Sequence, residues 1–450
     1  MRIRGLLVAA AVLAILAAGV WWSNRVKKAE EGKPRPDEPP KILSLAEDQI
    51  RRIEIRKKGV EPTVLEKNQA GNWEMTAPRP LRIDRDAVSS LTSTLSSLNS
   101  DRLIEEKAED LAPYGLNQPA VEILVTLKDG KTHKLLIGDE TPTGGGFYAR
   151  LDGDPRVFTI ASWNKSSLDK SWQDLRDKRL LTFDQDKLLR VELTAKGQTI
   201  EFGKNAQNEW QILKPRPLRA DNFQVEELIR KLRDARMDTS VSEAEAKKAA
   251  AAFAQATRVA IARVTDSSGT QELEVRKDKD KNYYARSSVV EGIHKIFSDI
   301  GDGLDKGLDD FRNKKLFDFG WSEPSRIEVR REGKTVVYQK VGDKWMSGDQ
   351  AMDSPSVQAL IDKLRDLSAV KFPEKGGGAP VLEITVTSNE GKRVEKVILS
   401  RQGNSWFATR EKEPAVYELE ASAVEQLQKA LGEVKPAPAG QKQGGTQGKK

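Results

Sequence analysis

The sequence carries an internal repeat that is marked by three tryptophans about 135 residues apart, Trp73, Trp210 and Trp345. After Trp73 comes PRPLRID at residues 78–84, and after Trp210 comes PRPLRAD at residues 215–221, with the same spacing from the tryptophan. A fixed period of this kind is typical of tandem modules. We therefore predict three copies of one module, which describes an architecture and names neither a ligand nor a reaction.

An aspartate follows each tryptophan and precedes a predicted amphipathic helix. Aspartate is a favoured N-cap, because its side chain accepts hydrogen bonds from the first backbone amides of a helix. Apolar residues then follow at offsets of four, seven and eleven, which places them on one helical face. The three aspartates and their apolar residues are Asp84 with Val88, Leu91 and Leu95; Asp221 with Val225, Leu228 and Leu232; and Asp353 with Val357, Leu360 and Leu364.

A second shared pattern supports the same period. Residues 168–183 align with residues 304–319 without a gap, and both stretches end in a run of leucine and phenylalanine. The third copy ends before this closing pattern, so we predict that it is truncated, as terminal repeats often are.

Period-two strands bounded by glycine turns surround each predicted helix. Residues 121–127 lead to Asp129-Gly130, a hairpin signal, and an aromatic strand follows at residues 147–150, 283–286 and 406–410. The predicted fold class is α+β: three tandem modules, each an antiparallel sheet with a packed amphipathic helix, behind a single N-terminal transmembrane helix.

The predicted organisation has six segments. They are an N-terminal membrane anchor (1–28), a proline- and charge-rich linker (29–41), module 1 (42–184), module 2 (185–320), a truncated module 3 (321–433) and a disordered tail (434–450).

The amino terminus predicts the compartment. Residues 5–22 carry no charge, and a helix of this length would cover about 27 Å, enough for a bilayer. The tryptophans at its end suit a membrane interface. A cleaved signal peptide is the alternative, because Ala17-Ala18-Gly19 could serve as a cleavage site. We expect a single-pass protein of the inner membrane with its body in the periplasm or extracytoplasmic space.

Composition excludes several kinds of chemistry. The chain has no cysteine, so it has no disulfide, thiolate metal site or cysteine nucleophile. Its net charge of +7 comes from 75 basic and 68 acidic residues that are interleaved along the chain. Interleaved charges indicate solvated faces, so we expect no nucleic-acid binding.

The sequence offers few candidates for catalysis. His133 and His294 are the only histidines, and they occupy different places in their modules. Serine-hydrolase, Walker, zinc-protease and EF-hand patterns are missing. Residues 144–146 predict a glycine hairpin loop, and a turn explains Asp152 and Asp154 better than a calcium site. We expect no catalytic residue, cofactor or metal.

The best binding candidates are four arginines that lie just before the predicted helices, Arg79, Arg82, Arg216 and Arg219. A helix N-terminus favours anions, so these residues are a possible anion or partner site. Solvated arginines on an extended Pro-Arg-Pro spacer are the simpler interpretation. The three repeated tryptophans could stack on sugars, although their identical placement favours packed core residues.

Several motifs together resemble the domain-of-unknown-function 4340 family. They are the Trp–Pro–x–Pro stretch, Leu111-Ala-Pro-Tyr114-Gly115-Leu116 with Pro119, Leu135-Leu-Ile-Gly138, Tyr148-Ala-Arg150 and Leu175-Arg-Asp-Lys178. The resemblance covers nearly all of residues 41–430, and the third copy lacks the Pro-x-Pro and Leu-Arg-Asp-Lys elements. It implies a membrane-anchored bacterial extracytoplasmic protein, often encoded beside ABC transporter components of the gliding-motility type.

We therefore expect a non-enzymatic, membrane-tethered scaffold or accessory protein that acts with ABC transporter subunits or another envelope complex. A cell-envelope glycan-binding array is the alternative. Exposed tryptophans would favour the glycan-binding interpretation, and buried tryptophans the scaffold.

Overall fold

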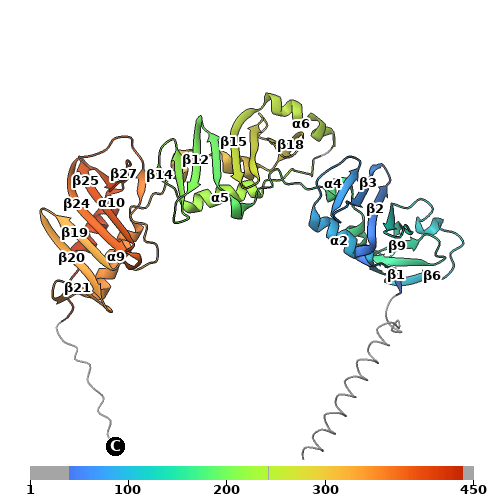
Figure 1. Cartoon of the computed structure of the whole chain (residues 1–450), viewed down its shortest axis with the longest axis horizontal. Helices are drawn as coiled ribbons and strands as arrows, with labels where there is room; N and C mark the ends of the chain where they lie inside the picture. Colours follow the sequence, from blue (N-terminus) through green and yellow to red (C-terminus); the bar gives the residue numbers. More distant parts are fainter. Residues whose placement is uncertain (1–39, 242, 439–450) are drawn as a thin grey trace, which may run out of the picture. The chain divides into compact units, whose positions relative to one another are not determined.

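The computed structural model describes residues 40–241 and 243–438 (Figure 1). The predicted anchor and almost all of the predicted linker lie outside these residues. None of the helices in the described part is long and apolar enough to cross a bilayer. The chain divides into two compact units, one up to Lys178 and one from Arg179 onward.

The first unit contains an eight-stranded antiparallel sheet in the order β4-β3-β2-β7-β8-β9-β10-β6. Its strands are β2 (Ile50–Lys57), β3 (Val60–Lys67), β4 (Trp73–Ala77), β6 (Arg102–Glu105), β7 (Val121–Leu127), β8 (Thr132–Glu140), β9 (Gly146–Leu151) and β10 (Val157–Ala161). Helix α2 (Arg85–Ser96) buries its apolar face in the same core as the sheet, and α3 (Ser162–Leu168) and α4 (Trp172–Leu175) follow the last strand. A separate pair joins β1 (Lys41–Ser44) to β5 (Ser97–Asn99).

The second unit contains two sheets. The first of them has the order β14-β13-β12-β11-β15-β16-β17-β18. Its strands are β11 (Arg190–Ala195), β12 (Gln198–Lys204), β13 (Trp210–Lys214), β14 (Leu218–Arg219), β15 (Thr257–Asp266), β16 (Gly269–Lys277), β17 (Tyr283–Ser287) and β18 (Ile293–Ile296). Its helices are α5 (Asn222–Arg233), α6 (Glu243–Gln255), α7 (Ser298–Leu304) and α8 (Leu308–Phe311).

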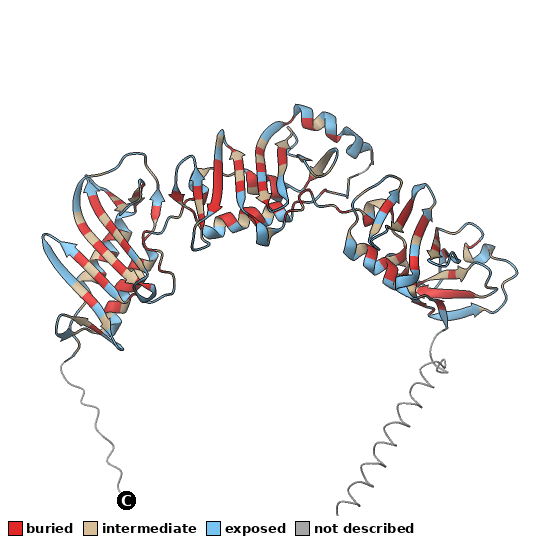
Figure 2. Cartoon of the chain, in the orientation of Figure 1, coloured by how far each residue is buried: buried red, intermediate tan, exposed pale blue. Residues whose placement is uncertain are grey.

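The other sheet of this unit has the order β22-β21-β20-β19-β24-β25-β26-β27-β23. Its strands are β19 (Arg326–Arg331), β20 (Lys334–Val341), β21 (Lys344–Ser347), β22 (Gln350–Ala351), β23 (Ala369–Lys371), β24 (Ala379–Ser388), β25 (Arg393–Gln402), β26 (Ser405–Arg410) and β27 (Val416–Leu419). Its helices are α9 (Ser354–Asp366) and α10 (Ala421–Glu433). Antiparallel sheets with packed helices confirm the α+β class, and buried residues follow the strands of all three sheets (Figure 2).

The three predicted N-caps are confirmed. Asp84 accepts hydrogen bonds from two amides of α2, and Asp221 and Asp353 each accept one from α5 and α9. The apolar residues that follow each aspartate at offsets of four, seven and eleven are all buried. The periodicity therefore placed the three core helices and the side that each of them buries.

Each core also takes in a short segment of chain that precedes its first long strand, here called the entry segment. The entry segments are residues 41–44, 179–183 and 315–319. Leu180 N donates to Ala235 O at 2.9 Å, Leu316 N donates to Leu367 O at 3.0 Å, and β1 pairs with β5 in the same way.

Burial of leucine explains why the entry segments belong to the sheet that follows them. Leu43, Leu180 and Leu316 are at most 3% exposed, and each lies in the core of its own unit. The predicted boundaries after residues 184 and 320 assigned 179–183 and 315–319 to the preceding copy. The burial of Leu180 and Leu316 corrects this assignment. Sequence alignment could not separate them, because the closing pattern runs without a break into the entry segment.

The backbone amide of each capping aspartate is bound by a closing segment. Asp84 N donates to Leu175 O, and Asp221 N donates to Phe311 O, both at 2.8 Å. In the third sheet Asp353 N donates to Lys435 O at 2.9 Å, and Ala437 N donates to Ala351 O at 2.9 Å.

The third sheet therefore has a closing segment as well. Residues 435–437 take the place of the closing pattern without sharing its sequence, because the contact uses backbone groups that any residue supplies. The prediction of disorder from residue 434 is wrong for these residues, and 439–450 lie outside the described residues.

The tryptophan that begins β13 offers a test of the core. Trp210 is 4% exposed and its Nε1 donates to Glu226, whereas Trp73 at the same place in the first sheet is half-buried. Replacing Trp210 with alanine should lower the free energy of unfolding by about 3–5 kcal/mol, as for other buried large aromatics. Trp73→Ala, the matched control, should cost clearly less. Urea denaturation followed by circular dichroism measures both, and equal costs would contradict the difference in burial.

Candidate functional site

The four arginines predicted as a binding site have different environments. Arg216 is exposed, and the exposed Arg79 lies 6.0 Å from the centre of the Trp172 ring. Arg82 lies 3.8 Å from a carboxylate oxygen of Asp177. Arg219 differs from all of these, because its side chain is only 19% exposed and is surrounded by acidic and aromatic groups of the third sheet.

Arg219 is held by the hairpin that joins β26 to β27. Its Nε lies 2.9 Å from Glu413 Oε1, although the two groups are not aligned for a hydrogen bond. The same guanidinium lies 3.7 Å from Asp318 and 3.4 Å from Tyr417 Oη. It also donates to the backbone oxygen of Lys315.

A second arginine completes this cluster from within the third sheet. Arg410 Nε donates to Glu413 Oε1 at 2.7 Å, and Arg410 Nη2 donates to Glu395 Oε1 at 3.0 Å. Tyr417 Oη donates to Glu413 Oε2 at 2.6 Å. Both oxygens of Glu395 accept from the backbone amide of Asp318 at 3.0 Å. We call these six residues, Arg219, Asp318, Glu395, Arg410, Glu413 and Tyr417, the junction cluster.

Within the cluster, Glu413 and Arg219 stabilise each other in the ionised form. Burial alone would raise the pKa of Glu413, but the nearby charges of Arg219 and Arg410 outweigh it and hold that pKa below its ordinary value. Burial also raises the pKa of Tyr417, so its hydroxyl keeps its proton and donates to Glu413. The pKa of Arg219 is raised despite its burial, because Tyr417 and Glu413 stabilise the cation.

Two more contacts join the two sheets of this unit. Arg393 Nη2 donates to Glu209 Oε1 at 2.7 Å. The buried guanidinium of Arg312 lies 3.6 Å from the centre of the Phe372 ring, a cation–π contact. Burial lowers the pKa of Arg312, and Asp309, at 3.3 Å, partly offsets that effect. The junction therefore uses cations from both sheets, each with an acidic or aromatic partner.

This arrangement decides how Arg219 can act. Its charge is already balanced by the chain's own carboxylates, so it is a structural cation between two sheets and not an anion-binding group. The simpler prediction of a solvated arginine is also wrong for Arg219, whereas exposed Arg216 fits it. The acidic partners Asp318 and Glu413 lie about 100 and 190 residues farther along the chain, and no local sequence pattern connects them to Arg219.

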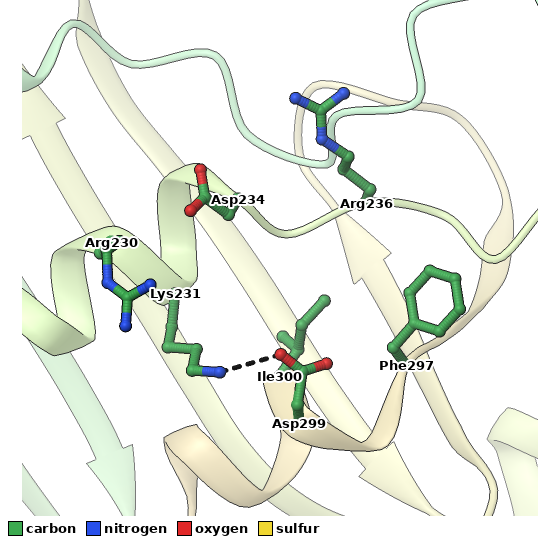
Figure 3. Close-up of a pocket in the computed structure, with 7 residues that line it drawn as sticks. All are labelled: Arg230, Lys231, Asp234, Arg236, Phe297, Asp299 and Ile300. Carbon is green, nitrogen blue, oxygen red and sulfur yellow. Dashed lines mark hydrogen bonds and ion pairs between the residues drawn. The ribbon is translucent and has the colours of Figure 1, made fainter.

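A small cavity of about 180 Å³ lies beside the C-terminal end of α5 (Figure 3). It is lined by Arg230, Lys231, Asp234, Arg236, Phe297, Asp299 and Ile300. Lys231 Nζ lies 2.9 Å from Asp299, and Arg230 pairs with Glu227 at 2.5 Å. The cavity therefore has a lining of mixed charge. The sequence analysis did not single it out, because none of its lining residues belongs to the repeated pattern.

The remaining residues singled out for chemistry lie on different strands and turns. His133 is half-buried in β8, and His294 lies in β18 with its Nε2 3.0 Å from Glu291 O. Asp154 binds Arg156 at 2.6 Å and forms part of a turn, as the sequence predicts. Among the described residues, no group of three or more histidine, aspartate or glutamate side chains could hold a metal ion.

The repeated tryptophans are poor platforms for sugars. Trp210 and Trp345 are 4% and 5% exposed, so their ring faces are covered by protein. Trp73 packs partly against the first core, and Lys67 lies 5.0 Å from its ring centre. Trp210 and Trp345 therefore pack inside the core, and Trp73 packs at its edge.

Comparison with known proteins finds one matching family. A family model described as Domain of unknown function (DUF4340) matches residues 73–214 and 210–381. The chain belongs to the DUF4340 family. Each match begins at one of the repeated tryptophans, Trp73 and Trp210, so one DUF4340 unit runs from the β4 or β13 tryptophan into the next sheet. No curated protein and no solved structure matches the chain.

Removing Arg219 tests the junction cluster. Arg219→Ala leaves the half-buried Glu413 with one arginine in place of two, and breaking an ion pair that is largely shielded from solvent is costly. We expect the free energy of unfolding to fall by about 3 kcal/mol, at the lower end of the range for such pairs, because Arg410 remains. Arg230→Ala, which removes an exposed ion pair, is the matched control and should leave the urea midpoint unchanged. An equal, small effect of both substitutions would contradict the cluster's structural role.

Acid should weaken the same cluster. Because the pKa of Glu413 is lowered from its ordinary value of 4.5, its contribution to stability is complete above that pH and is lost as the pH falls through the lowered value. Urea unfolding of the parent and of Glu413→Gln across this range should therefore differ above pH 4.5 and converge in stronger acid. Glu425→Gln, at an exposed position of α10, is the control and should parallel the parent at every pH.

Proposed function

We propose that the three sheets are copies of one module, here called modules 1, 2 and 3. All three share one strand order around a central antiparallel pair, and all three bind the backbone amide of a capping aspartate with a closing segment. The family model matches twice, with starting points one period apart. These observations support a repeat in which each module adds a sheet, a core helix and a closing segment.

We propose further that this protein is a non-enzymatic, membrane-tethered extracytoplasmic scaffold or accessory protein, acting with an ABC-type transport system or another envelope complex. One observation carries this proposal: the charged residues of the repeated pattern serve the architecture. Asp84, Asp221 and Asp353 cap helices, and Arg219 joins two modules. Selection for shape favours an interaction protein over a catalyst. The uncharged residues 5–22 and the family resemblance support the membrane and the transporter partner.

A cell-envelope glycan-binding array is the second candidate, and one observation keeps it in view. Trp163 and Trp321 are 68% and 89% exposed, and Arg365 lies 5.1 Å from the Trp321 ring centre. An exposed indole can stack on a sugar ring. Retention on immobilised peptidoglycan that is lost in Trp321→Ala, but kept in Trp210→Ala variants that fold, would favour this function over the scaffold.

The anchor is tested by fractionation. The full chain should stay in the membrane pellet after carbonate washing, because residues 5–22 are long enough to span a bilayer. A chain that starts at residue 29 behind a cleavable export signal should appear in the soluble periplasmic fraction. Cross-linking the full chain in its native cells should capture transport-system subunits. A soluble full chain with a mature terminus beyond residue 18 would contradict the anchor.

The absence of catalysis is tested at the histidines. Replacing both His133 and His294 with glutamine should leave cellular function intact, because the two histidines occupy different places in their modules. Deleting residues 1–22 should abolish function by releasing the body from its partner. Loss of function in the double-histidine variant, with membrane location and melting temperature unchanged, would overturn the scaffold proposal in favour of an enzyme.

A further inference from the structure

The hairpin that receives Arg219 has a counterpart in every module. Ala408 pairs with Tyr417 across the β26–β27 hairpin, Ala285 pairs with His294 across β17–β18, and Ala149 pairs with Phe158 across β9–β10. Each pair is separated by the same number of residues. Glu413 therefore corresponds to Asp154 in module 1 and to Val290 in module 2. This correspondence rests on the repeat put forward under the proposed function.

In module 3 this hairpin accepts an arginine from the module before it. The guanidinium of Arg219, from β14 of module 2, lies beside Glu413 and 6.0 Å from the centre of the Tyr417 ring. The acceptor thus consists of a carboxylate and an aromatic ring four residues later, and the donor is an arginine two residues before a capping aspartate.

Module 1 shows the same carboxylate, ring and guanidinium, but all three come from its own hairpin. Arg156 donates to Asp154 through Nη2 at 2.6 Å and through Nε at 3.0 Å. Its guanidinium lies 5.0 Å from the centre of the Phe158 ring. The position of Arg156 is Ala415 in module 3 and Gly292 in module 2. Only module 1 therefore carries an arginine at this position; the arginine by which module 3 binds its own Glu413, Arg410, stands at the place of Leu151.

The surroundings of Asp154 are open enough to receive a larger group. A wide surface hollow of about 710 Å³ lies over the β9–β10 turn. It is lined by Leu103, Glu106, Leu151 and residues 152–156. Asp152 and Glu106 add two further negative charges to this hollow, and the Arg156 side chain is 41% exposed at its edge. A guanidinium could therefore approach Asp154 from solvent if Arg156 were removed.

The opposite end of the repeat lacks the donor. Arg219 pairs with Gln211 in the β13–β14 ladder, and Ala351 pairs with Met346 at the same place in module 3. Both lie two residues before the capping aspartate, so Ala351 stands where module 2 has arginine. The chain thus has an acceptor that is filled at module 1 and a donor that is missing at module 3.

We propose that residues 154–158 of module 1 are a module-docking surface for the β21–β22 end of module 3 of a second copy of this chain, and that Arg156 keeps this surface closed. The closure, together with alanine at position 351, prevents copies from joining end to end. Cis occupation by Arg156 is favoured over an incoming arginine because the two partners are already held at high effective concentration in one hairpin.

Sedimentation velocity on the full chain in detergent tests this proposal with four proteins: the parent, Arg156→Ala, Ala351→Arg and the double variant. Only the double variant has both an open acceptor and a donor. Its sedimentation coefficient should rise with protein concentration above that of the parent, and the rise should weaken at high salt, because the contact is ionic. Adding Asp154→Asn to the double variant should remove the association.

Two results would overturn the proposal. Association of Ala351→Arg alone, to the same extent as the double variant, would mean that Arg156 closes nothing. A double variant that melts like the parent but does not associate would mean that the hairpin is no docking surface. Membrane retention is independent of both results, so the anchor and scaffold proposal can fail or succeed separately.

A small probe covers the case in which Ala351→Arg impairs folding. Arg156→Ala changes only an exposed edge residue, and ethylguanidinium chloride supplies the missing cation. Low millimolar ethylguanidinium should raise the melting temperature of Arg156→Ala relative to Asp154→Asn/Arg156→Ala, and ethylammonium should do so less because it lacks the planar fork. Equal responses of the two variants would contradict an arginine acceptor at Asp154.

Discussion

The fold depends on the aspartate that begins each core helix, because that residue joins three parts of its module. The side chain accepts amide hydrogen bonds from the helix, and the backbone oxygen of Asp84 or Asp221 accepts the first intrahelical bond. The backbone amide is taken by the closing segment, at Leu175, Phe311 or Lys435. The strand before the aspartate, the helix after it and the end of the module are thereby fixed at one point.

This arrangement explains how modules can follow one another with almost no linker. Asp177 N donates to Arg82 O, which closes module 1, and Leu180 N donates to Ala235 O, which opens module 2. At the next boundary Asn313 N donates to Arg219 O, and Leu316 N donates to Leu367 O. At the second boundary Lys314 O also accepts from Ala369 N, so the bonds of the two modules begin on neighbouring residues, 313 and 314. Between modules 2 and 3 this short connection leaves Arg219 within reach of the following hairpin, where Glu413 and Tyr417 contact it.

The polar residues of the repeat serve two structural purposes. Aspartates at the caps are needed in every module, and all three modules have them. The residue two places before the capping aspartate is arginine in modules 1 and 2, Arg82 and Arg219, and alanine in module 3, Ala351. Arg156 in module 1 is structural too, since it neutralises a carboxylate that corresponds to Glu413.

The sequence by itself determined the α+β class, the three core helices with their buried faces, and the aspartate caps, because these depend on contacts between residues near one another along the chain. It placed the boundaries too late, because the leucines at 180 and 316 follow the closing pattern in sequence but bury in the next core. It also missed the closing segment of module 3, because backbone hydrogen bonds leave no residue pattern. Only the tertiary structure decided the role of Arg219, because its partners Asp318, Glu413 and Tyr417 come from a different part of the chain. The sequence around an arginine does not show whether water or a glutamate balances its charge.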